Sequence, residues 1–330
     1  MQTARENIEK ALIKNHIIQD IDDIIGLQEI EHSYSNYVYI VNTKSGEYFC
    51  KYAEPRTKKS YISEPVSDRL KYEFEAVSLI QKYIKNTVKI PNIFFYDSDY
   101  CVLCTEVVPT WYELLSDLLL AGKIYKNIWI KLGESLGHIH AATYGIDTSL
   151  LSDKTCLKKI RIPLTYSNMW ASQEIQKMID LLSEDLIKNE ICIVHSDFKP
   201  NNIFVDKNGQ IIIVDFEFSH IGDPAAECWF FIGIYIHYIF AYPEKKYEYF
   251  RVISDFWEAY KRTFEKAWEK WFEKRVVQHT GVQLLVRLDG AIKFPSSQDD
   301  DNLKQLFRSA AEKIICWKIA TLWVMQKLFN

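Results

Sequence analysis

The sequence predicts an α+β fold of two lobes, with a small strand-rich N-lobe followed by a larger, mostly helical C-lobe. Before Pro109, short segments of alternating polarity bounded by turn residues predominate, which is the pattern of strands. After Pro109, long segments with apolar residues at helical spacing take over. A crossover near Glu106–Thr110 separates the two patterns, so we assign residues 1–107 to the N-lobe and residues 108–330 to the C-lobe.

The N-lobe elements are placed by their periodicity and their turns. The segments on either side of Ser45-Gly46 alternate like the two arms of a hairpin. Strands are predicted at Tyr37–Val41, Glu47–Tyr52, Ile93–Tyr96 and Cys101–Val107. A helix is predicted over Arg69–Ile84, where apolar residues share one face.

Long helices interrupted by short strands are the pattern of the C-lobe. Helices are predicted at Ile128–Tyr144, Ala171–Lys188, Ala225–Tyr242, Phe250–Phe272 and Leu303–Leu328. Between the second and third of these, short strands at Ile191–Val194 and Ile203–Asp206 flank a tight loop. A second hairpin follows, with Asn208-Gly209 as its turn and Ile211–Val214 as its return strand. The loops of both hairpins are expected on one side of one small sheet.

The tight loop carries the most informative residues of the chain. His195, Asp197 and Asn202 stand in the order H-x-D-x-x-x-x-N, and Asp215 follows the apolar run Ile211–Val214. Transfer of a phosphoryl group needs one carboxylate to orient the attacking hydroxyl, and an Asn and a second carboxylate to hold magnesium against the phosphates. We therefore predict Asp197 as the catalytic residue. Asn202 and Asp215 are predicted ligands of Mg²⁺, a cation that prefers oxygen donors.

The N-lobe supplies candidates for holding the nucleotide. Lys51 lies on a predicted strand, from which a lysine can reach the α- and β-phosphates of ATP. Glu73 lies on the apolar face of the Arg69–Ile84 helix, and an inward carboxylate needs a cationic partner. We expect Glu73 to pair with Lys51, with Glu75 as the alternative partner.

Two further segments are expected to line the nucleotide site. A loop at residues 31–36 stands where a turn would cover the phosphates, and because it contains no glycine, Ser35 and Asn36 are its candidate donors. The expected hinge lies around Glu106 and Val108, whose backbone groups would meet the adenine edge. ATP would then bind between the lobes, since cofactor clefts favour such interfaces. The sequence leaves GTP open as the alternative nucleotide.

Composition and charge argue against several other classes of function. A net charge of −4 provides no basic footprint for nucleic acid. Met1–Lys10 is polar rather than a signal sequence, and the longest apolar run, Cys228–Tyr242, is too short for a membrane span. The 7 cysteines are an odd number and scattered, which is typical of reduced thiols. We expect a cytoplasmic protein, monomeric or homodimeric, with a small-molecule partner and no nucleic-acid or membrane partner.

These residues together resemble the aminoglycoside phosphotransferase and choline kinase family, whose members share the protein-kinase-like fold. The most specific stretches are His195–Asn202, Asp215-Phe216-Glu217 and Gly222–Glu227. The resemblance implies that Asp197 is the catalytic base and that Asn202 and Asp215 bind magnesium. It also implies that Glu217 helps at a second metal position or orients the acceptor.

Three residues in these stretches qualify the resemblance. Ser196 stands where the family commonly has Gly, and Glu227 where it often has Asp. The stretch His195–Asn202 is also similar to the catalytic loop of serine/threonine kinases, in which the lysine contacts the transferred phosphate. This similarity implies that Lys199 stabilises the γ-phosphate, as a positive charge placed where the transition state needs it. A solvated loop lysine is the alternative.

We expect an ATP- and Mg²⁺-dependent phosphotransferase that moves the γ-phosphate to a hydroxyl of a small molecule. A protein kinase is less favoured, because Asp215-Phe216-Glu217 replaces D-F-G and Gly222–Glu227 follows too soon for an activation segment. A third hypothesis is a catalytically inactive nucleotide-binding module. The glycine-free loop favours it, whereas intact Lys51, Asp197 and Asp215 disfavour it.

The sequence leaves several chemical classes of acceptor open. The first expectation is an aminoglycoside-like antibiotic or another small metabolite, including a cationic one. Lys51–Pro55 and the residues that follow resemble the small lobe of methylthioribose kinases, which makes a sugar the alternative acceptor. The many tryptophans of the C-lobe would suit choline, because aromatic faces can cage a quaternary ammonium. At helical spacing, however, such aromatic residues more often belong to the core.

Overall fold

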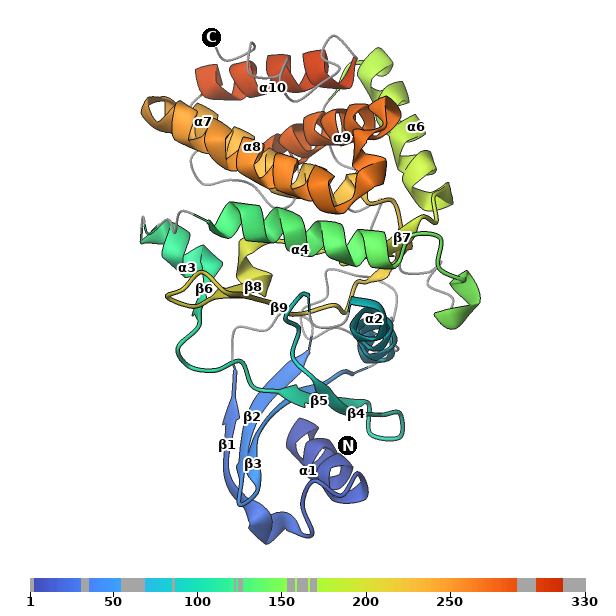
Figure 1. Cartoon of the computed structure of the whole chain (residues 1–330), viewed down its shortest axis with the longest axis vertical. Coiled ribbons are helices and arrows are strands. Elements are labelled where there is room, and N and C mark those ends of the chain that lie inside the picture. Colours follow the sequence, from blue (N-terminus) through green and yellow to red (C-terminus); the bar gives the residue numbers. More distant parts are fainter. Residues whose placement is uncertain are drawn as a thin grey trace.

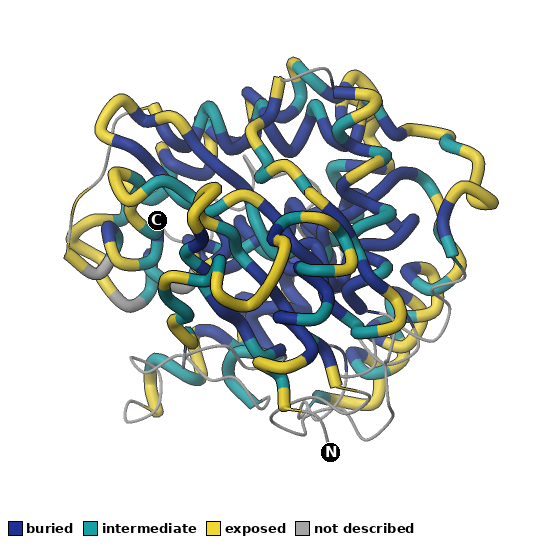
Figure 2. Tube along the Cα trace, turned by 90° about the horizontal axis from the view of Figure 1, so that it is seen from below, coloured by how far each residue is buried: buried dark blue, intermediate teal, exposed yellow. Residues whose placement is uncertain are grey.

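The structure, a computed structural model, has the α+β architecture that the sequence predicts. It describes residues 3–30, 36–54, 69–84, 87–121, 123, 127–152, 158, 166, 171–289 and 301–316. The strand-rich N-terminal part lies below the helical C-terminal part in Figure 1. Buried residues gather in the interior, while the outer turns are mostly exposed (Figure 2). The predicted fold class is therefore confirmed.

The N-terminal part is built on an antiparallel sheet with the strand order β1-β2-β3-β5-β4. Its strands are β1 (Ile24–Glu29), β2 (Tyr37–Thr43), β3 (Gly46–Tyr52), β4 (Ile93–Asp97) and β5 (Val102–Glu106). Strand β1 lies outside the predicted strands. None of its side chains is fully buried, so its sequence carries only a weak alternation of polarity.

Helices cover both faces of this sheet. On one face Cys50, Val102 and Cys104 pack in a cluster with α1 (Ala4–Lys14). On the other face Leu103 packs with residues of α2 (Arg69–Ile84). Lys51 is the register partner of Leu103 in the neighbouring strand, and directly opposed residues point to the same face of a sheet. The alternation of β3 therefore directs Lys51 toward α2.

The C-terminal part is a layered arrangement of helices, with α3 and α4 on the side of the five-stranded sheet and α10 at the opposite end (Figure 1). Its helices are α3 (Leu115–Leu120), α4 (Ile128–Ala142), α6 (Gln173–Lys188), α7 (Ala225–Ala241), α8 (Lys246–Thr263), α9 (Lys270–Asp289) and α10 (Asp301–Ile315). Short 3-10 helices occur at Ile21–Asp23, Thr148–Leu150, Pro200–Asn202, Pro243–Lys245 and Glu265–Trp268. The apolar core of this part also includes Val77, Ile80 and Ile84, so α2 joins the sheet to the bundle.

Helix α7 contains most of the apolar run Cys228–Tyr242. Phe231, Ile232 and Ile236 of this helix are buried among the other helices. No single helix in the described ranges is long and apolar enough to cross a membrane. One pair of helical segments, Ala225–Phe240 with Pro243–Thr263, reaches the necessary length and composition only together, and it bends by 117° at its break.

The single helix predicted over Phe250–Phe272 is wrong. Helix α8 ends at Thr263, and α9 starts only after a short 3-10 turn. At the break, the backbone of Phe264 is extended and its ring is buried against Tyr260 and Phe272. One aromatic cluster therefore contains residues from two helices. Their spacing along the chain resembles that of one continuous apolar helix face, which is why a single helix was expected.

The two ends of the chain also differ from the prediction. Helix α1 was not predicted, because polar residues dominate its sequence, although Ile8, Ala11 and Leu12 form a buried stripe at helical spacing. The helix predicted over Leu303–Leu328 corresponds to α10, and its positions from 317 onward lie outside the described residues.

Two small sheets, rather than the expected one, hold the loops of interest. Strand β7 (Cys192–Val194) pairs with β10 (His220–Gly222). Strand β8 (Ile203–Val205) pairs with β9 (Ile211–Ile213) and with β6 (Glu113–Leu114). The expectation of a single sheet is wrong. Because β7 and β8 belong to different sheets, both the β7–β8 loop and the β9–β10 loop pass from one sheet to the other, which brings them side by side.

Helices α4 and α8 approach each other closely at Gly133, where an added Cβ would overlap the carbonyl oxygen of Phe256. We expect Gly133→Ala to lower the free energy of unfolding by about 1–3 kcal/mol, because overpacking outweighs the gain in helix propensity of about 1 kcal/mol. Urea denaturation measures the change. Ala141→Gly, at an exposed position of α4, is the control for propensity alone. A Gly133→Ala variant as stable as the parent would contradict the packing argument.

Candidate functional site

A single buried carboxylate holds the β7–β8 loop. Glu227, in the first turn of α7, accepts hydrogen bonds from the backbone N–H of His195 at 2.9 Å and from that of Ser196. The Glu227 carboxylate also lies 3.0 Å from Nε2 of His140, whose other ring nitrogen lies 2.8 Å from the Tyr260 hydroxyl. Burial by itself would raise the pKa of Glu227, but these partners hold it below its ordinary value. The loop is thus anchored through its backbone.

The backbone of Ser196 explains part of this anchoring. Its φ of 65° lies in the left-handed region, where residues with a side chain are strained. This conformation turns the chain after Ser196, so that the next N–H, that of Asp197, faces His195 while the N–H groups of His195 and Ser196 face Glu227. Glycine adopts it without steric cost, which accounts for the glycine that the family commonly has at this position.

His195 shapes the same loop from inside. Its ring is fully buried and packs against Phe216 in a tilted arrangement, with 4.3 Å between ring centroids. Nδ1 accepts a hydrogen bond from the backbone N–H of Asp197 at 3.3 Å, and Nε2 lies 2.9 Å from the carbonyl oxygen of Val214. Because Nδ1 accepts, Nε2 carries the proton and donates to Val214. The histidine therefore ties the loop of Asp197 to the residue that precedes Asp215.

Three of the predicted site residues meet in this loop. The carboxylate of the buried Asp197 accepts a hydrogen bond from Nδ2 of Asn202 at 3.0 Å. Nζ of Lys199 lies 2.8 Å from the same carboxylate oxygen. With its amide nitrogen turned to Asp197, Asn202 directs its amide oxygen away from that carboxylate, and this oxygen is the atom that could bind a metal ion.

Asp215 joins the N-lobe lysine in a buried ion cluster. Nζ of Lys51 lies 2.9 Å from both carboxylate oxygens of Glu73 and 2.6 Å from Oδ1 of Asp215. Glu75, the alternative partner, instead accepts hydrogen bonds from Ser152. Burial alone would lower the pKa of Lys51, but the attraction of Asp215 and Glu73 raises it above its ordinary value. Burial raises the pKa of Glu73, against the opposing effect of Lys51.

A second buried cluster, centred on Arg69, was not predicted. Nδ2 of Asn36 donates to Oε2 of Glu217 at 2.7 Å, and Nη2 of Arg69 donates to Oδ1 of Asn36 at 3.0 Å. Nε of Arg69 lies 3.6 Å from the same Glu217 oxygen. The side chain of Asn36 is thus engaged inside the protein, and Ser35 lies outside the described residues. The one sequence signal for Arg69 is its position four residues before Glu73, which places both on one side of α2.

The predicted hinge follows β5. The backbone N–H of Glu106 donates to the carbonyl of Asn92 at 2.8 Å, and its exposed side chain accepts from the N–H of Asn92 at 3.0 Å. The Glu106 carbonyl accepts from the Thr105 hydroxyl at 3.2 Å, and a carbonyl can accept a second bond. The hinge groups that can still bond an adenine are therefore this carbonyl and the backbone of the half-buried Val108.

The donor set fits magnesium better than a metal held by the protein alone. Within the described ranges there is no cluster of three or more His, Cys, Asp or Glu side chains arranged to hold a metal ion. Asn202 and Asp215 each offer oxygen, and the Asp215 side chain is 33% exposed despite its contact with Lys51. Mg²⁺ commonly binds through one or two carboxylates together with phosphates and waters. Glu217, the other predicted ligand, is turned toward Arg69 and Asn36.

The chain combines a strand-rich part with a helical part. The Lys51–Glu73 pair contacts Asp215, whose loop is bonded to the loop of Asp197. This combination is typical of kinase-like phosphotransferases. A family model described as the phosphotransferase enzyme family matches residues 26–268. This span is well over half of the chain, so the chain belongs to that family and is a small-molecule kinase. The family resemblance read from the motifs is confirmed. No curated protein is significantly similar in sequence.

Solved structures with this fold come from the same class of enzyme. The aminoglycoside phosphotransferase of Alicyclobacillus acidocaldarius superposes with a TM-score of 0.53 at 13% identity, over 93% of each chain. Macrolide 2'-phosphotransferase type I has a TM-score of 0.51 at 11% identity, over 96% of this chain and 98% of that chain. ADP-bound aminoglycoside phosphotransferase APH(2'')-Ib has a TM-score of 0.50 at 15% identity, over 92% of this chain and 99% of that chain. At these identities the likeness shows the fold alone.

The buried Glu217 makes stability depend on pH. Burial, with Asp215 adding to it, raises the pKa of Glu217 from 4.5 to about 7. Between these values the folded protein binds a proton that the unfolded chain releases, so this part of the stability is lost as pH rises. We expect Glu217→Gln to remove it, so that its free energy of unfolding falls less than the parent's between about pH 5 and about pH 8.

Urea denaturation across this pH range measures the difference between variant and parent. Glu134→Gln on α4, whose side chain is 42% exposed, is the matched control for loss of a carboxylate. Parallel pH profiles of parent and Glu217→Gln would show that Glu217 is not protonated on folding.

Proposed function

We propose that the chain transfers the γ-phosphate of ATP, with GTP as the alternative donor, to a hydroxyl of a small molecule, with Mg²⁺ as cofactor. One observation carries the proposal. Lys51 of the sheet lies 2.6 Å from Asp215, and His195 bonds the Asp215 loop to the loop of Asp197. Groups suited to phosphates and metal therefore border groups suited to the acceptor. In-line transfer depends mostly on such positioning and on stabilising charge.

Asp197 is the proposed catalytic residue. It would orient the acceptor hydroxyl and take its proton late, as the bond to phosphorus forms. Lys199, at 2.8 Å from this carboxylate, would balance the negative charge that develops on the transferred group. Because Lys199 is about one-third exposed, it can turn from Asp197 to a phosphate oxygen, while the buried Asp197 keeps its hydrogen bond from Asn202.

The opposite side of the site would hold the nucleotide. Lys51, kept in place by Glu73, would contact the α- and β-phosphates, and backbone groups of Glu106 and Val108 would meet the base. Asn202 and Asp215 would hold magnesium, which when bound neutralises phosphate charge and aligns the phosphoryl group. Asp215 would then share its carboxylate between Lys51 and the metal ion. That APH(2'')-Ib, which shares the fold, is solved with ADP bound supports a nucleotide as the phosphate donor.

The alternatives to a small-molecule kinase find less support. β10 begins at His220 and α7 at Ala225, so a strand and a helix occupy the segment after Asp215 where a protein kinase has its activation segment. A catalytically inactive module would not need Asp197, Lys199 and Asn202 in mutual contact. The aminoglycoside and macrolide phosphotransferases among the structural relatives support a small-molecule acceptor.

Loss of the Asp197 carboxylate should stop transfer without preventing nucleotide binding. We expect Asp197→Asn to slow phosphorylation at least about 100-fold, the scale of general-base catalysis, while the Kd of Mg-ATP stays within about twofold. A nucleotide-consumption screen against aminoglycosides, choline, methylthioribose and homoserine provides the acceptor, and calorimetry measures Kd. Asp206→Asn, which alters a carboxylate in the β8–β9 turn, is the control. Phosphorylation at the parent rate would remove Asp197 from its role.

Loss of the Asp215 carboxylate should uncouple nucleotide binding from magnesium. We expect Asp215→Asn to raise the Kd of ATP measured with Mg²⁺ at least about tenfold, the effect of about 1.4 kcal/mol, and to leave binding in EDTA nearly unchanged. Isothermal titration with and without Mg²⁺ separates the two effects, and Asp206→Asn again serves as control. An unchanged affinity for Mg-ATP would contradict the metal role.

A further inference from the structure

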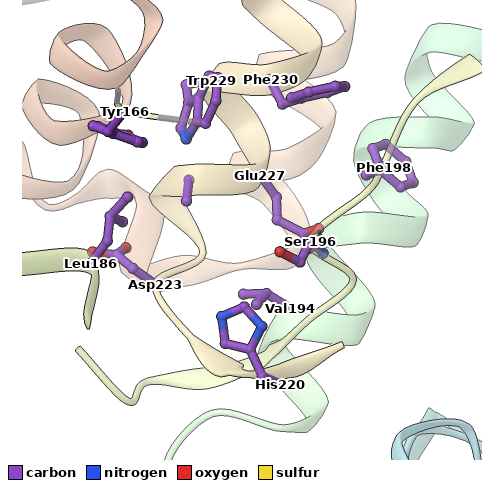
Figure 3. A pocket seen from close by; sticks show the side chains of 11 residues that line it. Tyr166, Leu186, Val194, Ser196, Phe198, His220, Asp223, Glu227, Trp229 and Phe230 are labelled. Carbon is purple, nitrogen blue, oxygen red and sulfur yellow. Dashed lines mark hydrogen bonds between the residues drawn. The ribbon is translucent and has the colours of Figure 1, made fainter. Parts of the chain in front are cut away.

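A pocket of about 70 Å³ lies on the C-lobe side of the catalytic loop (Figure 3). Ser196 and Phe198 form part of its lining, and they flank Asp197 in the sequence. The opposite wall comes from Trp229 and Phe230 of α7 and from Tyr166. The pocket thus borders the catalytic loop on both sides of Asp197, whose own side chain does not line it. Its volume is below the roughly 300–1,000 Å³ of sites that enclose drug-sized ligands, so it suits a single ring or a short chain.

The acidic groups of this pocket are already neutralised by the protein. Asp223 contacts Arg275, accepts from Nδ2 of Asn189 at 2.8 Å and from the backbone N–H of Ala225 at 2.9 Å. Glu227 is occupied by the catalytic loop. Among the described lining residues there is consequently no open carboxylate for an ammonium group. A polycation placed here would lose hydration without gaining a partner, which is unfavourable.

The other lining residues are mostly aromatic or aliphatic, and they include His220. The rings of Tyr166 and Trp229 meet edge to face at 6.3 Å between centroids, and Phe230 lies 5.7 Å from Trp229. The Tyr166 hydroxyl lies 2.6 Å from Nδ1 of His279. Burial lowers the pKa of His279 to about 3, so this imidazole is neutral and adds no charge behind the wall. Such surfaces favour a flat apolar group.

One polar group of the wall has no partner within the described part of the chain. Trp229 is 4% exposed, and its indole N–H makes no hydrogen bond there. Figure 3 shows this ring at the upper wall of the pocket with its nitrogen on the pocket side. A buried donor without an acceptor is destabilising, because the group has lost its hydrogen bonds to water. An oxygen or nitrogen atom of a molecule in the pocket would remove this cost.

We propose that the pocket binds the body of the acceptor, and that the acceptor is an uncharged hydroxyl compound with a flat apolar ring and a hydrogen-bond-accepting atom. This inference rests on the proposed function. The ring would pack against Tyr166 and Trp229, and the accepting atom would meet the Trp229 N–H. The hydroxyl oxygen forms a bond to the γ-phosphorus as the bond to the β-phosphate oxygen breaks. The hydroxyl proton passes to Asp197, and the nucleoside diphosphate leaves.

Three acceptors test the proposed chemistry on the full chain with Mg-ATP. Phenyl β-D-glucoside has the ring without charge, methyl β-D-glucoside has the same sugar without the ring, and kanamycin is a polycation. We expect kcat/KM for the phenyl glucoside to exceed both others at least about tenfold, because the ring contact contributes about 1.4 kcal/mol. Equal or faster transfer to kanamycin or to the methyl glucoside, or no transfer to the phenyl glucoside, would overturn the proposal.

A pair of tryptophan variants tests the wall itself. Trp229→Phe removes the indole N–H and should raise KM for the phenyl glucoside about three- to tenfold, the scale of one hydrogen bond, with KM for ATP unchanged. Trp257→Phe also removes a buried indole N–H that lacks a partner among the described residues, but this residue does not line the pocket. It should leave both KM values at those of the parent. Equal KM values for the two variants would overturn the role of Trp229.

Calorimetry with Mg-ATP separates the two proposals. If Mg-ATP binds to the parent and this binding weakens in Asp215→Asn, a failed acceptor test overturns only the assignment of the pocket. If Mg-ATP does not bind to the parent, the proposed function itself fails.

Discussion

The site depends first on the buried cation of Lys51. From the central strand of the sheet, it bonds Glu73 of α2 and Asp215 of the β9–β10 loop, so one ammonium group joins the sheet, the helix and the C-lobe. Breaking a buried ion pair by removing one partner costs about 3–5 kcal/mol, because the other charge stays uncompensated. Any arrangement that moved these elements apart would carry that cost, so the electrostatics holds the nucleotide side of the site in one geometry.

The β7–β8 loop, on the proposed acceptor side, is held by hydrogen bonds to its backbone and by one histidine. Glu227 binds the β7–β8 loop through backbone N–H groups, and His195 ties the same loop to Val214. Neither contact uses the side chains of Asp197 or Lys199, which therefore remain available for chemistry while the loop beneath them stays fixed. Positioning by backbone bonds from a buried core is what a phosphotransferase needs, since small displacements of reacting groups are costly in rate.

Charge is distributed unevenly around the two sides. Near the nucleotide side, Lys51 and Arg69 face three carboxylates, and burial favours the protonated form of Glu217. Magnesium and a triphosphate would rebalance this cluster. On the proposed acceptor side the charges are paired within the protein, as for Asp223 with Arg275, and the pocket has mainly aromatic and aliphatic walls. This division is the basis of our proposal that the acceptor is recognised by shape and apolar contact, with charge reserved for the nucleotide.

The sequence by itself determined most of the local elements and singled out the candidate site residues. The helix Arg69–Ile84 was predicted with its observed bounds, the pairing of Lys51 with Glu73 followed from one inward carboxylate, and spacing alone singled out Asp197. The division of the chain at residue 107 and the roles of the site residues stay predictions. Tertiary structure decided that β7 pairs with β10, that α8 breaks before Phe264 and that Arg69 meets Glu217. Periodicity reports which face of a segment is buried, but the partner of a buried polar group comes from a distant part of the chain, and only folding brings the two together.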